Sequence, residues 1–313
     1  MKLQQLRYLV EVERRGLNIS AAADALHTSQ PGVSKQIAML EDELGVMIFE
    51  RAGKRLVDIT APGRTILMMA RRVLAEAANM KRVGEDFATE GVGQLSIATT
   101  HTQARYTLPP VIQRFVGSHP NVRLHIQQGS PEQVAGWILD RSADLGIATE
   151  ALDRYDDLLT LPCFQWAHLV VTPQEHPLLA HQPLTLTALA AYPLITYDAT
   201  FTGRSRIDRA FERQQLRPNV MLTAIDSDVI KTYVALGLGV GIIAKMAFDA
   251  GRDATLAALP AAHLFEGNTT RVAFRRDAWL RRHEYDFMQF LAPQLTRPVI
   301  EATLRDEGAD PGL

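Results

Sequence analysis

The sequence is poor in cysteine and has no long hydrophobic run. Cys163 is the only cysteine among 313 residues, which excludes an internal disulfide and any metal site built from several cysteines. No apolar run is long enough to span a bilayer, and residues 1–16 lack the uninterrupted apolar core of a signal peptide. We therefore expect a cytoplasmic protein without membrane contact, in which Cys163 is a small buried apolar residue rather than a reactive thiol.

Motifs of the common enzyme classes are also missing. The chain has no phosphate loop with Gly-Lys-Ser or Gly-Lys-Thr and no nucleophile elbow, and its nine histidines are dispersed. Residues 237–241 resemble a glycine-rich nucleotide loop, but they run from a predicted helix to a predicted strand, the reverse of the dinucleotide-binding order. We therefore expect no catalytic residues, no metal site, no cofactor and no enzymatic activity.

Positive charge is scarce overall but locally concentrated. The net charge of −2, taken alone, argues against a nucleic-acid partner. Between residues 51 and 72, however, the only acidic residue is Asp58, and there are six basic ones. These six are Arg51, Lys54, Arg55, Arg64, Arg71 and Arg72. A local excess of this kind would allow contacts to the phosphates of DNA.

The beginning of the chain has the pattern of a helix-turn-helix. A short alanine-rich segment over residues 20–26 is followed by a polar turn and by a longer helical segment over residues 29–43. In the longer segment Val33, Ile37 and Leu40 repeat at spacings of four and three, which places them on one buried stripe. A helical hairpin in another kind of small bundle is the alternative interpretation.

The opposite face of the longer helix carries polar residues at its amino-terminal end, the part of a recognition helix that reaches base edges in the major groove. A proline is tolerated there, because first-turn amides have no intrahelical acceptor. Residues 46–50 and 55–59 are expected to pair as a wing with a basic tip that lies along the DNA backbone or the minor groove. The predicted DNA-binding residues are Ser29, Gln30, Pro31, Ser34, Lys35, Arg51, Lys54 and Arg55.

Residues 62–90 are expected to form one long helix. Apolar or small residues recur in it at alternating spacings of four and three, which is typical of a heptad seam. The members of this seam are Ile66, Ala70, Val73, Ala77, Met80, Gly84 and Phe87. At 1.5 Å per residue such a helix is about 40 Å long. We expect it to pair with a second copy, which would place two recognition helices on successive major-groove faces; a core helix of a monomer is the alternative.

After residue 92 the pattern changes to alternating strands and helices, which indicates parallel βαβ units. Strands are expected over residues 94–99, 123–128, 145–148, 169–172, 194–197, 220–223 and 240–244, with a final strand and helix within residues 270–292. We therefore expect an α/β fold overall: a winged helix-turn-helix domain, a long linker helix, and a two-lobed effector domain like that of periplasmic binding proteins. The expected ranges are 1–60 for the DNA-binding domain, 61–91 for the linker or dimerisation helix, 92–162 with 269–295 for lobe I, 163–268 for lobe II, and 296–313 for a tail.

Hydroxyl side chains lie beside the ends of the predicted strands of both lobes. Thr100 and Thr102 follow one strand, Thr149 follows another, and Thr202 precedes a helix that begins near residue 204. Ligands bind at the carboxyl edge of parallel sheets, where helix amides point outward. With the amide of Gln103 these hydroxyls would form a neutral donor set suited to a small oxyanion. Each threonine could instead be only a helix cap or solvent-exposed.

Both halves of the chain resemble the LysR-type transcriptional regulators. The segment SQPGVSKQIAMLEDELGVMIFER at residues 29–51 is similar to the helix-turn-helix signature of that family. Five segments resemble its CysB and Cbl subgroup, regulators of sulfur assimilation. They are residues 99–106 (TTHTQARY), 128–131 (QGSP), 148–151 (ATEA), 201–205 (FTGRS) and 228–233 (DVIKTY). The resemblance covers nearly the whole chain.

The resemblance implies an activator of cysteine-biosynthesis genes that binds double-stranded promoter DNA as a homodimer or homotetramer and contacts RNA polymerase. It implies that Thr100, Thr102, Gln103, Thr149 and Thr202 bind a small-molecule effector, either O-acetylserine or N-acetylserine or a sulfate-like anion. Cbl-type members would instead respond to adenylyl sulfate and control the use of sulfonates. A cytoplasmic protein that only binds a small anion is the alternative from another class.

Overall fold

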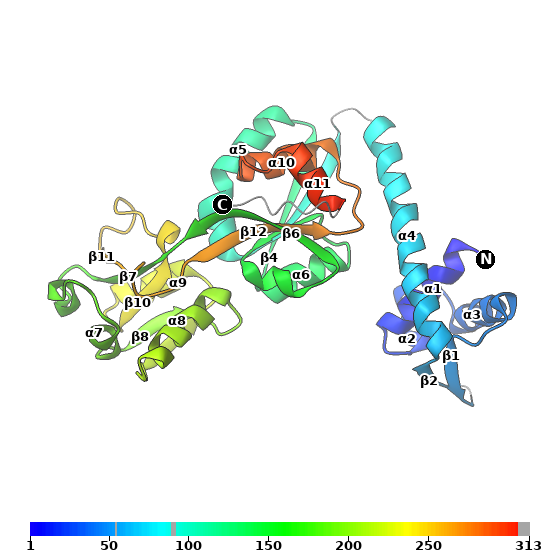
Figure 1. Cartoon of the computed structure of the whole chain (residues 1–313), viewed down its shortest axis with the longest axis horizontal. Helices are drawn as coiled ribbons and strands as arrows, with labels where there is room; N and C mark the ends of the chain where they lie inside the picture. Colours follow the sequence, from blue (N-terminus) through cyan, green and yellow to red (C-terminus); the bar gives the residue numbers. More distant parts are fainter. Residues whose placement is uncertain (54, 89–91, 306–313) are drawn as a thin grey trace. The chain divides into compact units, whose positions relative to one another are not determined.

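The computed structural model describes residues 1–53, 55–88 and 92–305. Lys54, a predicted DNA-binding residue, lies outside the described residues, and so do the side chains of Phe87 and Thr202. The described chain forms two compact units (Figure 1). Residues 1–88 with Asp277–Trp279 make up the first unit, and the remaining residues make up the second.

The first unit consists of three short helices, a two-stranded ribbon and a long helix. Its elements are α1 (Leu3–Arg14), α2 (Ile19–Ala25), α3 (Gln30–Leu44), β1 (Phe49–Ala52), β2 (Arg55–Ile59) and α4 (Ala61–Ala88). The two strands pair antiparallel, with Phe49 opposite Ile59. The predicted winged helix-turn-helix and long helix are therefore confirmed, although the first wing strand begins three residues later than expected.

Local hydrogen bonds explain where the two helices of the motif begin and end. Asn18 caps α2 by accepting a hydrogen bond from Ala21 N at 3.0 Å, and Ser29 caps α3 by accepting one from Gly32 N at 3.3 Å. α3 ends at Gly45, whose φ of 69° is the left-handed conformation that glycine adopts without a steric penalty. The buried stripe predicted for α3 is present, because Val33, Ile37 and Leu40 have no exposed surface.

A carboxylate also lies in this core. Glu41 is 4% exposed and follows Ile37 by four residues, so it lies on the buried stripe of α3. Its Oε1 accepts hydrogen bonds from Ile48 N at 2.9 Å and Phe49 N at 3.1 Å, and its Oε2 accepts one from Arg51 Nη2 at 2.8 Å. Glu41 therefore ties the recognition helix to the first strand of the wing. Sequence reasoning missed it, although its position on the stripe was visible.

α4 uses only part of the predicted heptad seam as a free surface. Ile66 and Ala70, its first members, pack into the core of the N-terminal unit. Val73, Met80 and Gly84 lie exposed, Val73 at 40% and Met80 at 68%. The expectation of one continuous seam from residue 66 onward is therefore wrong for its beginning, because the first turns of α4 cover the three-helix bundle.

The second unit contains two five-stranded sheets (Figure 1). The first has the order β4-β3-β5-β12-β6 and the second has the order β11-β7-β10-β8-β9. The strands of the first sheet are β3 (Gly93–Thr99), β4 (Val122–Gln128), β5 (Leu145–Ala148), β6 (Leu158–Trp166) and β12 (Asn268–Arg275). The strands of the second are β7 (His168–Pro173), β8 (Leu194–Tyr197), β9 (Val220–Ala224), β10 (Val240–Ala244) and β11 (Leu256–Pro260).

Helices cover both sheets, and Figure 1 shows α5 and α10 on one side of the first sheet and α6 on the other. The helices are α5 (Leu108–Ser118), α6 (Pro131–Leu139), α7 (Leu186–Ala190), α8 (Thr202–Arg213), α9 (Ser227–Ala235), α10 (Arg282–Leu291) and α11 (Arg297–Leu304). Four single turns are η1 (Gln103–Thr107), η2 (Glu150–Arg154), η3 (Pro177–Ala180) and η4 (Lys245–Ala247). None of the described helices combines the length and the apolar character needed to cross a membrane.

The topology confirms the predicted two-lobed α/β domain. β3 pairs parallel with β4 and β5, and β8 pairs parallel with β9 and β10. The chain crosses between the sheets twice, after Trp166 and again before Asn268. β6 continues in the first sheet to Trp166, beyond residue 162 where lobe I was expected to end. α11 lies in the segment that was expected to be a tail.

Candidate functional site

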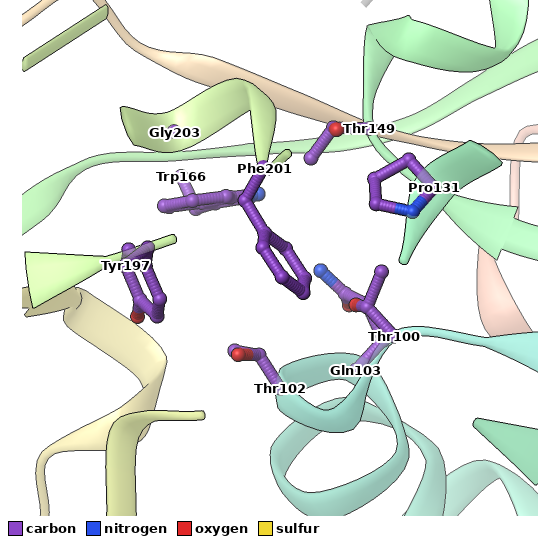
Figure 2. A pocket seen from close by; sticks show the side chains of 9 residues that line it. All are labelled: Thr100, Thr102, Gln103, Pro131, Thr149, Trp166, Tyr197, Phe201 and Gly203. Atoms are coloured by element: carbon purple, nitrogen blue, oxygen red, sulfur yellow. The ribbon is translucent and has the colours of Figure 1, made fainter. Parts of the chain in front are cut away.

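A pocket lies between the two sheets of the second unit, beside the carboxyl ends of β3, β5 and β8 (Figure 2). The cavity has a volume of about 30 Å³, and the empty space reaches about 380 Å³ only when the open solvent at its mouth is included. A cavity of this size lies far below the roughly 300–1,000 Å³ of pockets for drug-sized ligands, so the pocket suits only a small molecule or ion. The residues that line it are Thr100, Thr102, Gln103, Pro131, Thr149, Trp166, Tyr197, Phe201 and Gly203.

Four of the five predicted effector-binding residues line this pocket. Thr100 is 6% exposed, Thr149 is 8% exposed, Gln103 is buried and Thr102 is half-buried. The side chain of Thr202 lies outside the described residues, but the backbone of α8 begins there, next to the pocket residue Gly203. The structure brings these residues together, and their contact with an effector stays a prediction.

The ends of two neighbouring strands place the buried threonines. Thr100 follows β3 directly, and Thr149 follows β5 directly. The hydroxyl of Thr99 donates a hydrogen bond to the carbonyl of Ile147 at 2.8 Å and so joins the two strand ends. Because β3 and β5 are parallel neighbours, the residues that follow them emerge at the same edge of the sheet.

Gln103 is held rigidly at the start of η1, a π-helical turn. Its Nε2 donates a hydrogen bond to Thr270 Oγ1 at 2.9 Å, and its Oε1 accepts one from Thr107 Oγ1 at 2.8 Å. Such π-turns inside helical segments are frequent at functional sites. One N–H of the Gln103 amide remains for an effector, because an amide nitrogen carries two donors.

Tyr197 connects the pocket to the core of the second lobe. Its hydroxyl lies 2.7 Å from Ser227 Oγ and accepts a hydrogen bond from Ala244 N at 2.8 Å. Burial raises the pKa of Tyr197, which keeps the phenol neutral. The lining of the pocket thus contains neutral donors and acceptors and no charged side chain.

Sequence reasoning missed the aromatic part of the lining. Trp166, Tyr197 and Phe201 form much of it, and Figure 2 shows the Phe201 ring in the middle of the labelled side chains. A signal was present at Phe201, which occupies the N-cap position of α8, where Ser, Thr, Asp or Asn is usual. Phe201 makes no side-chain capping hydrogen bond, and only its backbone carbonyl accepts one from the first turn of α8, from Arg204 N at 3.0 Å.

A charged cluster joins the two lobes through Asp228. The hydroxyl of Tyr106 donates a hydrogen bond to Asp228 Oδ1 at 2.5 Å, and Arg105 Nε and Lys231 Nζ lie 3.4 and 3.3 Å from the carboxylate. Burial and the hydrogen bond to Asp228 raise the pKa of Tyr106 to about 12. Burial alone would raise the pKa of Asp228, but the Tyr106 hydroxyl and the Lys231 ammonium outweigh it and lower this pKa.

The same cluster contains the one set of metal-binding side chains found among the described residues. His101, Asp226 and Asp228 have ligand atoms within 4.8 Å of one another. Arg105 and Lys231 already form ion pairs with Asp228, and Asp226 caps α9 by accepting a hydrogen bond from Val229 N. These contacts favour an ion-pair network that joins the lobes over a site for a divalent cation.

The predicted DNA-binding residues of α3 lie at its accessible amino-terminal end. Gln30, Pro31 and Lys35 are exposed, and the Gln30 amide donates a hydrogen bond to Ser34 Oγ at 3.1 Å. Arg55 of the wing is exposed. Arg51 has a structural role in addition to the predicted one, because Glu41 holds its guanidinium. Contact of these residues with DNA stays a prediction.

Comparisons with known proteins cover both units. A model described as bacterial regulatory helix-turn-helix protein, lysR family, matches residues 3–64, and one described as LysR substrate binding domain matches residues 88–296. The chain is 53% identical over 307 residues to the HTH-type transcriptional regulator CysB of Burkholderia cenocepacia, covering 98% of each protein. It is 52% identical over 306 residues to the regulator SsuR of the same species, covering 98% of this chain and 99% of SsuR.

Solved structures agree with these matches. The cofactor-binding domain of the Cbl transcriptional regulator is 42% identical to this chain, with a TM-score of 0.67 over 69% of this chain and 95% of that domain. The matched families and relatives are transcriptional regulators, which confirms the prediction that the protein is not an enzyme. Together with the helix-turn-helix and the two-lobed pocket domain, these similarities show that the chain belongs to the LysR family of bacterial transcriptional regulators.

Proposed function

We propose that the protein regulates genes of sulfur assimilation and cysteine biosynthesis, and that its effector is an acylated serine or a sulfate-like oxyanion. Relatives named CysB and Cbl, 45–53% identical over 92–99% of this chain, support the biological role. The pocket is the observation that supports the proposed chemical class of the effector. Buried threonine hydroxyls, the Gln103 amide and the amino terminus of α8 supply neutral donors to one small space, which suits a small oxyanion.

A Cbl-type regulator of sulfonate use that responds to adenylyl sulfate is the second candidate, because proteins named Cbl match 92% of this chain. The size of the pocket favours the first candidate. A cavity of about 30 Å³, with the Phe201 ring among its lining side chains, is nearer in size to a sulfate or an acylated serine than to a nucleotide.

Each range of the chain has its own role in the proposed regulator. Residues 1–60 bind double-stranded promoter DNA with the first turns of α3 in the major groove and with the wing along the backbone. Residues 61–91 dimerise through the exposed stripe of α4 that contains Val73, Met80 and Gly84, in a homodimer or homotetramer. Residues 92–162 with 269–295 and residues 163–268 are the effector lobes, and residues 296–313 follow them. The regulator acts in the cytoplasm and contacts RNA polymerase at its promoters.

A thermal-shift panel tests the effector. The full chain is heated with O-acetylserine, N-acetylserine, sulfate, thiosulfate or adenylyl sulfate, and the midpoint of unfolding is compared with that of the free protein. A ligand at about one hundred times its Kd stabilises the folded state by roughly 2.7 kcal/mol. We expect an acylated serine or sulfate to raise the midpoint. A rise with adenylyl sulfate alone would favour the second candidate, and no rise with any compound would contradict both.

Replacing Gln30 with alanine tests the recognition helix. The variant should lose about 1–3 kcal/mol of binding free energy at a site that the protein selects from a random DNA library, because a base contact is removed. Binding to a scrambled fragment at the same salt concentration should change little. Met39→Ala, at an exposed position further along α3, serves as the control. An equal loss on both fragments would assign Gln30 to the backbone instead of to a base.

A further inference from the structure

Buried polar atoms without hydrogen-bond partners gather behind one wall of the pocket. Among the described residues, five side chains in this region carry seven such atoms. These side chains are Glu150, Trp166, His168, Arg206 and Asn268. Buried polar groups in folded proteins almost always have a partner, and each exception requires an explanation. A group of exceptions next to a ligand pocket indicates a further part of the binding site.

His168 lies directly behind the wall formed by Trp166 and Gly203. Its ring contacts the Trp166 indole edge-on, with centroids 5.3 Å apart. His168 Nε2 is 3.2 Å from the point where a Cβ atom would lie on Gly203, in the first turn of α8. The residue is 1% exposed, and neither ring nitrogen has a hydrogen-bond partner. An unpartnered imidazole therefore points at the uncapped helix end that borders the pocket.

Asn268 lies on the same side of the first sheet as the pocket. It is the ladder partner of Trp166 across β6 and β12, and side chains of such partners lie on one face. Two residues further along this face, Thr270 accepts the hydrogen bond from the pocket residue Gln103. Asn268 has no exposed surface, and neither its amide oxygen nor its amide nitrogen has a partner.

The chemistry of these groups differs from that of the threonines. Burial lowers the pKa of His168 to about 4, with Arg206 contributing, so the neutral imidazole offers one donor and one acceptor. The Asn268 amide also offers both, and Glu150 adds an unpartnered carboxylate oxygen. The carboxylate is paired with the Arg206 guanidinium at 2.8 Å, so the charges in this group balance. A set of donors and acceptors beside such an ion pair suits a neutral group with both an N–H and a C=O.

We infer that His168 and Asn268, which lie outside the lining of the pocket, determine the specificity of the effector site by binding an amide-bearing arm of the effector that reaches behind Trp166, beyond the oxyanion held by the threonines. This inference rests on the proposed function. N-acetylserine carries an amide beside its carboxylate and would use both parts of the site. Sulfate has no such arm and would use only the threonine part.

Calorimetric titration of the full chain with sulfate and with N-acetylserine tests this division in the wild type and in the variants His168→Phe and Asn268→Leu. Both replacements put an apolar side chain of similar size in place of the polar one, so the hydrogen-bonding atoms are removed. We expect each variant to bind N-acetylserine about ten-fold more weakly, the effect of one lost hydrogen bond, and to bind sulfate within about two-fold of the wild type. Equal factors for the two ligands, or no change in either, would overturn the inference.

A second titration uses only the wild-type protein, so its result does not depend on whether a variant folds. 3-Hydroxypropionate keeps the carboxylate and hydroxyl of N-acetylserine and lacks the amide, so it should bind the wild type at least about ten-fold more weakly. Equal affinities for the two compounds would overturn the inference while leaving the proposed function intact. If the wild type bound neither sulfate nor N-acetylserine, the proposed function itself would fail, and the inference with it.

Discussion

Replacing Glu41 with alanine is expected to lower the free energy of unfolding of the N-terminal unit by at least about 2 kcal/mol, because two buried backbone amides lose an acceptor at roughly 1–3 kcal/mol each. The carboxylate is the acceptor for two buried backbone amides, Ile48 N and Phe49 N, and the counter-ion of Arg51. Its removal leaves the two amides without this acceptor, and unsatisfied buried groups carry a full desolvation penalty. The Arg51 side chain is 29% exposed and can bind water instead. The wing should also lose its connection to the recognition helix.

Hydrogen exchange measures this effect locally, because the chain has two compact units and a single global midpoint would mix them. Amides of α3 and β1 in the full chain should exchange faster in Glu41→Ala, whereas those of the second unit should be unchanged. Glu41→Gln keeps an acceptor oxygen and should lie between the wild type and the alanine variant. Asp42→Ala, at the next and exposed position, should change stability by less than about 0.5 kcal/mol. Protection in Glu41→Ala equal to that of the wild type would refute the role.

Replacing Thr100 and Thr149 together with valine is expected to weaken the binding of sulfate and of N-acetylserine by about one hundred-fold. A hydrogen bond to a charged group contributes roughly 1.5–3 kcal/mol, and two are lost, so one hundred-fold is the lower end of the expected range. Valine has nearly the shape of threonine, so the pocket keeps its form while its donors disappear. Both side chains are buried, which makes competition from water small.

Calorimetric titration gives the two affinities directly. The variant Thr303→Val, on α11 and outside the pocket lining, provides the matched control, because it makes the same chemical change elsewhere. Retention of wild-type affinity in the double variant would contradict the role of these threonines in effector binding.

Much of the fold could be predicted because its buried surfaces repeat locally along the chain. The expected strands over 145–148, 194–197 and 240–244 agree with β5, β8 and β10 at both ends. They are short apolar runs, buried at every position. The stripe on α3 followed from helical spacing in the same way.

β6 and β11 escaped prediction for the opposite reason. β6 contains Pro162, and β11 reads LAALP, a composition with weak preference for strands. Both are held by antiparallel partners far away in the chain, β12 and β7. Where pairing between distant segments determines a strand, local sequence carries little signal for it.

The pocket shows the same division. The threonines could be located because each stands next to the end of an element that periodicity reveals. Trp166 could not, since its place depends on where the chain crosses from one sheet to the other. The heptad pattern of α4 was recognised, but sequence could not assign Ile66 and Ala70 to the N-terminal core, because that assignment depends on how α4 packs against the bundle.

The central claim is that a ligand in the threonine-lined pocket changes how the protein binds DNA. Only a ligand that binds two arrangements of the protein with different affinity can produce such a change, and the coupling must be reciprocal. The most direct measurement is a titration of N-acetylserine into the complex of the full chain with a DNA site selected from a random library. The dissociation constant of the complex and its mobility in a gel are measured at each concentration of N-acetylserine. We expect the wild type to respond, and the double valine variant at Thr100 and Thr149 to bind the same DNA with the same initial affinity and not to respond. An equal response in both proteins would contradict the account.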